Sequence, residues 1–168
     1  MSETANAIMD AAELRIQKGG YGSFSFRELA ADVGVKSSSV HYHFPTKENL
    51  AAAVTRRYAE RCLDSVDEQI KAGGNPKKVW RDLFRTALVG DARMCLCGAL
   101  GASAPDLPPE VVAESRTFFR QAIQRLVEAG VPRDSATQLM ATLEGAQILA
   151  NTLDDVTVFD AATASFGA

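Results

Sequence analysis

The chain has 168 residues, which suits one globular unit or a small module joined to a larger one. Hydrophobic residues make up 46% of it and charged residues 23%, as in an ordinary soluble folded protein, and no apolar run is long enough to span a bilayer. The net charge is −3, but residues 15–47 hold 5 basic and 2 acidic side chains. This asymmetry permits nucleic-acid binding near the N-terminus without showing it, because a solvated surface gives the same count.

The first residues include Glu3 and Asp10 and lack a signal-peptide pattern, so we expect a cytoplasmic protein that does not enter the membrane. The three cysteines, Cys62, Cys95 and Cys97, are odd in number and lack zinc-site spacing, which argues against a disulfide framework and a structural metal. The sequence offers no nucleophile–base pair, no metal-ligand cluster and no phosphate loop. We therefore expect no catalytic residues, no cofactor and no enzyme activity.

Helical spacing of apolar residues recurs along the chain, and strand signals are scarce, so the sequence predicts an all-α fold. The first helix is expected over residues 4–18. Ile8, Ala12 and Ile16 are spaced four apart on one of its faces, and Gly19 with Gly20 ends it.

Two short helices are predicted next. Ser25 and Glu28 form a capping box at the start of the second helix, which ends near Asp32. Gly34 supplies a turn that tolerates a positive φ, and a third helix covers residues 36–43 before Pro45 ends it. Two short helices joined by a tight turn that contains glycine are typical of a helix-turn-helix.

A long fourth helix is expected to begin after Thr46 and to end at Gly73 and Gly74. Its apolar residues recur every four positions. A step of four advances about 400° around an α-helix, so the stripe drifts along the helix. Such drift indicates a helix that packs on one domain at its start and on another at its end. The stripe consists of Leu50, Val54, Tyr58, Cys62, Val66 and Ile70.

The rest of the chain also reads as helices. Asn75 and Pro76 begin an amphipathic helix, a short helix with Cys95 and Cys97 is expected within residues 91–104, and residues 105–109 form a loop. Longer helices follow over residues 109–129 and 132–154, and a short one over 156–165. The 132–154 helix is apolar or small on nearly every side, which predicts burial on both sides, the second side by another subunit.

The segment FRELAADVGVKSSSVHYHFPTKENL, residues 26–50, resembles the N-terminal signature of the TetR family of bacterial transcriptional regulators. The resemblance covers about the first 55 residues. It departs from many relatives at His41, where Tyr is common, and at Lys36, where Ser or Thr is common. The resemblance implies a helix-turn-helix DNA-binding domain at residues 1–48 and a helical ligand-binding and dimerisation domain at residues 49–168.

The resemblance also implies the residues that bind DNA. Its third helix enters the major groove of operator DNA, where short hydroxyls can meet bases or phosphates and Lys36 can neutralise a phosphate. A cation in the first turn of the fourth helix opposes the helix dipole, which suggests a phosphate partner for Lys47. The predicted DNA-binding residues are Ser25, Lys36, Ser37, Ser38, Ser39, His41, Tyr42 and Lys47. The alternative is a polar, serine-rich exposed turn with no ligand.

For the C-terminal domain the resemblance implies an apolar pocket for a small-molecule effector. The predicted lining residues are Trp80, Phe84, Met94 and Phe119, although aromatic side chains at helical spacing are more often core. The sequence thus predicts a homodimeric repressor that binds a near-palindromic operator and is released by a small-molecule inducer. Two alternatives remain: a regulator of the same fold that senses thiol-reactive compounds through Cys95 or Cys97, and a dimeric binding protein that has lost its DNA.

Overall fold

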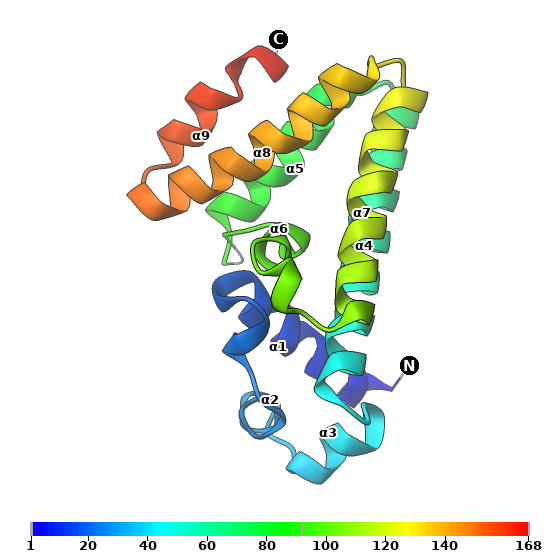
Figure 1. Cartoon of the computed structure of the whole chain (residues 1–168), viewed down its shortest axis with the longest axis vertical. Helices are drawn as coiled ribbons and strands as arrows, with labels where there is room; N and C mark the ends of the chain where they lie inside the picture. The colour runs from blue at the N-terminus through cyan, green and yellow to red at the C-terminus, as the bar shows by residue number, and fades with distance from the viewer. Residues whose placement is uncertain (1, 92, 168) are drawn as a thin grey trace. The chain divides into compact units, whose positions relative to one another are not determined.

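The computed structural model describes residues 2–91 and 93–167, and this part of the chain is helical with no strand (Figure 1). The predicted all-α fold is therefore confirmed. The chain divides into two compact units, residues 1–59 with 96–116 and residues 60–95 with 117–168. The helices α4 (Lys47–Lys71) and α7 (Pro109–Glu128) each contribute residues to both units.

The first unit contains α1 (Glu3–Gly19), α2 (Phe26–Val33), α3 (Ser37–His43), the first half of α4, and α6 (Leu96–Gly101), which packs against α1. A single turn of 3-10 helix, Tyr21–Ser23, joins α1 to the segment before α2. The apolar face of each helix points inward, as the four-residue spacing predicts. The fully buried core side chains of this unit include Ile8, Ala12, Ile16, Leu29, Val40, Leu50 and Val54.

The second unit contains the rest of α4, then α5 (Pro76–Val89), most of α7, α8 (Arg133–Leu153) and α9 (Val156–Ala162). Asn75 caps α5 by accepting the backbone N–H groups of Lys77 and Lys78, as its place before Pro76 predicts. In Figure 1, α5 and α8 run side by side and α9 folds back along α8. The fully buried side chains of this unit include Trp80, Phe118, Leu126, Leu139, Leu143 and Phe159.

The segment between α5 and α8 differs from the sequence-based prediction in two details. The short helix α6 begins at Leu96, so it contains Cys97 but not Cys95. The backbone of Arg93 has a φ of 62°, outside the right-handed helical region, and the Cys95 N–H is donated to the side chain of Gln147. The predicted loop at 105–109 overlaps a 3-10 turn, Ala104–Asp106, before α7 begins at Pro109.

Removing the cap of α2 should destabilise the first unit. The hydroxyl of Ser25 accepts the backbone N–H of Glu28, so Ser25→Ala leaves that donor without its cap and should lower the free energy of unfolding by about 1 kcal/mol. Urea denaturation followed by circular dichroism measures the change. Ser38→Ala is the matched control, because the Ser38 side chain is exposed on α3, and it should stay within about 0.5 kcal/mol of the parent. Equal stability of the two variants would contradict the capping role.

Candidate functional site

The helix-turn-helix is fixed by a cap at one end and a left-handed turn at the other. The Ser25 hydroxyl accepts the Glu28 N–H at 3.3 Å and donates to the Glu28 carboxylate at 2.7 Å, and these bonds lower the pKa of Glu28. Gly34 ends α2 with a φ of 74°, a conformation that favours glycine, and the Val35 N–H returns to the Ala30 carbonyl at 2.9 Å. The capping box and the turn that the sequence predicts are both present.

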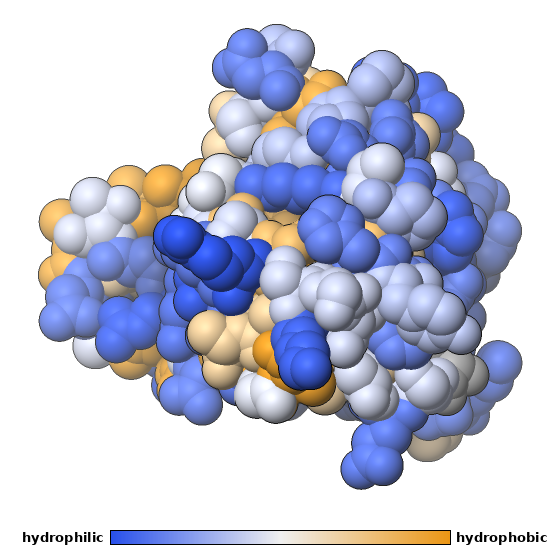
Figure 2. Space-filling view, turned by 90° about the horizontal axis from the view of Figure 1, so that it is seen from below, coloured by the Kyte–Doolittle hydropathy of each residue, from blue (hydrophilic) through white to orange (hydrophobic). Residues whose placement is uncertain are grey.

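The α3 helix buries one face and exposes the other. Val40 is fully buried, whereas Lys36, Ser37, Ser38, His41 and Tyr42 are exposed. Ser39 is half-buried. Tyr42 is the most exposed large apolar side chain described, at 85% of its surface. In Figure 2, which looks from the end where α2 and α3 lie in Figure 1, hydrophilic side chains dominate the near surface. The exposed α3 residues thus form a continuous polar face that is available to a ligand.

Lys47 lies where the sequence predicts, in the first turn of α4, but its ammonium has partners within the protein. Nζ donates to the Phe24 carbonyl at 2.7 Å and lies 4.4 Å and 4.6 Å from the ring centres of Phe24 and Tyr21. Burial lowers its pKa. The Tyr21 hydroxyl donates to Glu48 at 3.3 Å, and burial with that carboxylate raises the pKa of Tyr21 to about 12. Lys47 therefore joins the start of α4 to the segment before α2.

The basic residues of the first unit differ in their availability. The Arg15 guanidinium makes two bonds to the Asp32 carboxylate, at 2.6 Å and 3.1 Å, so its charge is neutralised on the protein surface. Arg27 on α2 and Lys36 before α3 are both exposed. Our sequence analysis did not single out Arg27. Its signal was available, because Arg27 is a cation two residues after the Ser25 cap, at a helix N-terminus where a side chain reaches solvent.

The four side chains predicted to line an effector pocket lie in two environments. Trp80 is fully buried and Phe84 is nearly so, and the Trp80 ring centre lies 6.4 Å from that of Phe84 and 6.2 Å from that of Phe118. Phe119, whose ring centre lies 5.3 Å from that of Phe118, is half-buried, as is Met94. The structure thus brings Trp80 and Phe84 into one aromatic cluster with Phe118, which is not among the four predicted lining residues.

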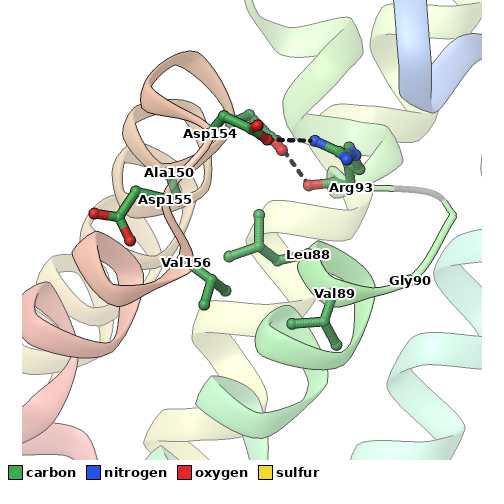
Figure 3. A pocket seen from close by; sticks show the side chains of 9 residues that line it. Leu88, Val89, Gly90, Arg93, Ala150, Asp154, Asp155 and Val156 are labelled. Carbon is green, nitrogen blue, oxygen red and sulfur yellow. Dashed lines mark hydrogen bonds and ion pairs between the residues drawn. The ribbon is translucent and has the colours of Figure 1, made fainter.

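A surface pocket of about 300 Å³ lies where α5 ends and α8 meets α9 (Figure 3). Leu88, Val89 and Val156 are among its apolar side chains, and Arg93 pairs with Asp154 at 3.2 Å. None of the four predicted effector-lining residues lines this pocket.

All three cysteines are buried. Next to Cys95, the buried Gln147 side chain joins two segments: its Oε1 accepts the Cys95 N–H at 2.8 Å and its Nε2 donates to the Phe84 carbonyl at 2.8 Å. Sequence reasoning missed Gln147, although a glutamine in a helix that is otherwise apolar on most sides was a visible signal. Within residues 2–91 and 93–167, no group of three His, Cys, Asp or Glu side chains is arranged to hold a metal ion.

Comparison with known proteins identifies the N-terminal module. Residues 8–54 match the family model described as bacterial regulatory proteins, tetR family. A TetR-family transcriptional regulator from Agrobacterium tumefaciens superposes with a TM-score of 0.90 at 27% identity, covering 96% of this chain and 94% of that one. A TetR transcriptional regulator from Legionella pneumophila superposes with a TM-score of 0.87 at 27% identity, covering 99% of this chain and 96% of that one.

Residues 8–54 thus match the tetR family of bacterial regulatory proteins, and the whole chain is similar in fold to solved TetR-family regulators. The reduced form of NemR from E. coli shares the fold, with a TM-score of 0.84 at 21% identity over 98% of this chain and 95% of that one. No curated protein matches the chain. The fold of the chain is that of these transcriptional regulators. No helix in its described part is long and apolar enough to cross a membrane.

Lys47→Ala should destabilise the first unit. The substitution removes the bond to the Phe24 carbonyl and two cation–π contacts, and it should lower the free energy of unfolding by about 1–3 kcal/mol. Chemical denaturation measures the change. Lys36→Ala removes an exposed cation near α3 and should cost less than about 0.5 kcal/mol. A Lys47→Ala protein as stable as the parent would show that these contacts contribute nothing to the fold.

Proposed function

We propose that this protein is a homodimeric transcriptional repressor that binds a near-palindromic operator and releases it when a small-molecule effector binds. In this proposal residues 1–48 bind DNA, and residues 49–168 bind the effector and form the dimer. The observation that carries the proposal is the α3 helix, which exposes a polar face while Val40 on the opposite face is fully buried. A helix that is held rigidly and keeps its polar side outward suits insertion into the major groove.

The DNA-side roles follow from residue chemistry. Lys36 and Arg27 are exposed cations that can neutralise phosphates, and Ser25 stands at a helix N-terminus whose dipole favours an anion. Ser37, Ser38 and Tyr42 expose hydroxyl groups that can donate to or accept from base edges. The remaining predicted contacts are Ser39, His41 and Lys47. The Lys47 ammonium is already bonded to the Phe24 carbonyl, so a substitution of Lys47 would also remove a contact within the protein. A substitution of Lys36 therefore tests a phosphate contact more directly.

The dimer is supported by an apolar surface on α8. Ile148, Leu149 and Leu153 expose 47%, 53% and 61% of their surfaces, although the opposite face of the same helix is buried. Exposed apolar side chains gathered on one helix face mark a protein–protein interface. A twofold dimer would repeat the α3 helix and so would read two half-sites of opposite direction, about one DNA turn or a multiple apart.

The effector is assigned to the second unit because that unit holds the aromatic cluster of Trp80, Phe84 and Phe118. Phe119 and Met94 are half-buried and complete the proposed lining. A ligand can shift the protein between two states only by binding them with different affinity. An effector that favours a state with misplaced recognition helices would therefore relieve repression.

The alternative, a thiol-sensing regulator, receives less support. A reactive cysteine needs access and a nearby cation that lowers its pKa. Cys95 exposes 1% of its surface and Cys97 exposes none, and the carboxyl group of Glu144, rather than a cation, is a neighbour of Cys95. The burial of both thiols limits access to a reactive compound and favours the effector-binding proposal.

Fluorescence anisotropy with labelled DNA from just upstream of the protein's own gene tests operator binding, with a random duplex as control. The parent should bind the upstream site more tightly than the random duplex. Lys36→Ala should reduce the slope of log affinity against log salt by about 1, because one phosphate contact is lost. Tyr42→Ala should lower the affinity while changing the free energy of unfolding by less than about 0.5 kcal/mol, because the side chain is exposed.

The matched control is Lys71→Ala, which removes an exposed cation at the far end of α4 and should bind DNA as the parent does. If the operator lies elsewhere in the genome, selection of bound sequences from a random duplex library would identify it. If that selection enriches no sequence, the DNA-binding function is wrong.

Leu149→Glu should convert the dimer to a monomer, because it places a charge in the proposed apolar interface. Size-exclusion chromatography with light scattering measures the mass, and circular dichroism should show unchanged helix content because Leu149 is exposed in the single chain. Thr86→Glu, an exposed substitution on α5, is the control and should remain dimeric. A parent protein that is monomeric at micromolar concentration would contradict the proposed assembly.

A further inference from the structure

A stripe of polar side chains runs along α8. Glu144, Gln147, Asn151 and Asp154 are spaced by three, four and three residues, which places them on one face of the helix. Three of them hold the segment that precedes α6. Gln147 accepts the Cys95 N–H, Asn151 donates to the Arg93 carbonyl at 2.8 Å, and Asp154 pairs with the Arg93 guanidinium (Figure 3).

Glu144 is the exception in this stripe. Both of its carboxyl oxygens are buried, and neither is hydrogen-bonded to a nitrogen or oxygen of the described residues. Burial, with the Cys95 thiol beside the group, raises the pKa of Glu144 well above its ordinary value. A buried carboxyl group that has a thiol, a weak donor, beside it and no cation among the described residues is poorly compensated, so its presence calls for an explanation other than packing.

Several cations of this unit are paired with other acids. Arg85 and Arg81 pair with Asp160, Arg125 pairs with Asp67, and Lys78 pairs with Asp82. The pKa of Glu144 is raised by its burial and by the neighbouring Cys95 thiol, and no cation of the described residues lowers it. The protein itself therefore supplies this carboxyl group with no counter-charge from its described part.

A second unpaired polar atom lies at the same level of the unit. The indole Nε1 of Trp80 is buried without a hydrogen-bond acceptor in the described structure. The bond from Gln147 to the Phe84 carbonyl sets the register of α8 against α5. Leu88 and Ala150, which follow Phe84 and Gln147, line one pocket, so α5 and α8 run in the same direction. Trp80 lies one turn before Phe84, and Glu144 lies about one turn before Gln147, so both groups occupy the same stretch of the contact between α5 and α8.

We propose that Glu144 recognises the effector, and that the effector is an apolar amine whose ammonium group binds the Glu144 carboxylate beside the Trp80 ring. This inference rests on the proposed function, because it names the class of ligand that the regulator would bind. An ammonium group supplies the charge and the donors that the carboxyl group lacks, and aromatic faces attract cations. An anionic ligand supplies no positive charge to Glu144, and an aliphatic ligand would leave the carboxyl group unpaired.

The position of Glu144 also connects the ligand to the DNA-binding unit. Glu144 adjoins Cys95, whose N–H is held by Gln147 one turn further along α8. The next residue, Leu96, begins α6, and α6 packs against α1 of the helix-turn-helix unit. An ammonium group bound at Glu144 therefore acts on the segment that leads directly into α6.

Trp80 is the only tryptophan of the chain, so its fluorescence reports binding at this place. We would titrate the full-length protein with 4-phenylbutylamine, 4-phenylbutanol and 4-phenylbutyrate, which share one skeleton and differ in the head group. The amine should bind at least about tenfold more tightly than the alcohol or the acid, the ratio expected for one charge-assisted bond. Glu144→Gln should bind the amine no better than the alcohol, whereas Asp134→Asn, an exposed acid on the same helix, should keep the preference.

Three outcomes would overturn the assignment: no binding of any probe at millimolar concentration, equal binding of amine and alcohol by the parent, or an amine preference that survives in Glu144→Gln. The comparison of the three probes on the parent stands even when the variant fails to fold, which circular dichroism would reveal. These titrations contain no DNA. Loss of the amine preference with operator binding intact therefore refutes this inference alone, and an amine preference without DNA binding refutes only the regulator.

Discussion

A helix of the length of α3 does not form by itself in water, because nucleation of a helix costs more than seven residues return. The exposed face of α3 therefore depends on the contacts that hold α3 from the rest of the unit. The Val40 side chain, on the inner face of α3, is buried. The ring of His41 packs edge-on against that of Phe26, with ring centres 4.7 Å apart. The Phe44 N–H donates to the Val40 carbonyl and ends the helix. Packing on one side leaves the other side free to be polar.

The same dependence explains the network around α3. Ser25 begins α2, Gly34 turns the chain, and Lys47 joins the start of α4 to the Phe24 carbonyl. The carbonyl and the two aromatic rings around Lys47 stabilise its charge where the helix dipole does not. Lys47, which the sequence predicts to contact a phosphate, thus stabilises the protein in the absence of DNA. Measurements of stability and of DNA binding can separate these two roles.

In the second unit, backbone groups outside the helices impose the corresponding constraint. Residues 93–95, which precede α6, lie outside any helix, and Arg93 has a left-handed conformation. Side chains of α8 bond to two of these groups: Gln147 accepts the Cys95 N–H, and Asn151 donates to the Arg93 carbonyl. This requirement explains why an otherwise apolar helix carries a polar stripe, and it makes the unpaired Glu144 stand out.

The sequence by itself determined the features that rest on neighbours three or four residues apart. The Ser25 cap, the Gly34 turn, the Asn75 cap and the apolar stripe of α4 all depend on local hydrogen bonds or helical periodicity, and each is found where the pattern predicts. Only the tertiary structure decided the partners of Lys47, which is 23 residues from Phe24, and of Gln147, which is 52 and 63 residues from Cys95 and Phe84. Contacts over such separations leave no periodic signal in the chain, because the path between the two residues can take any length.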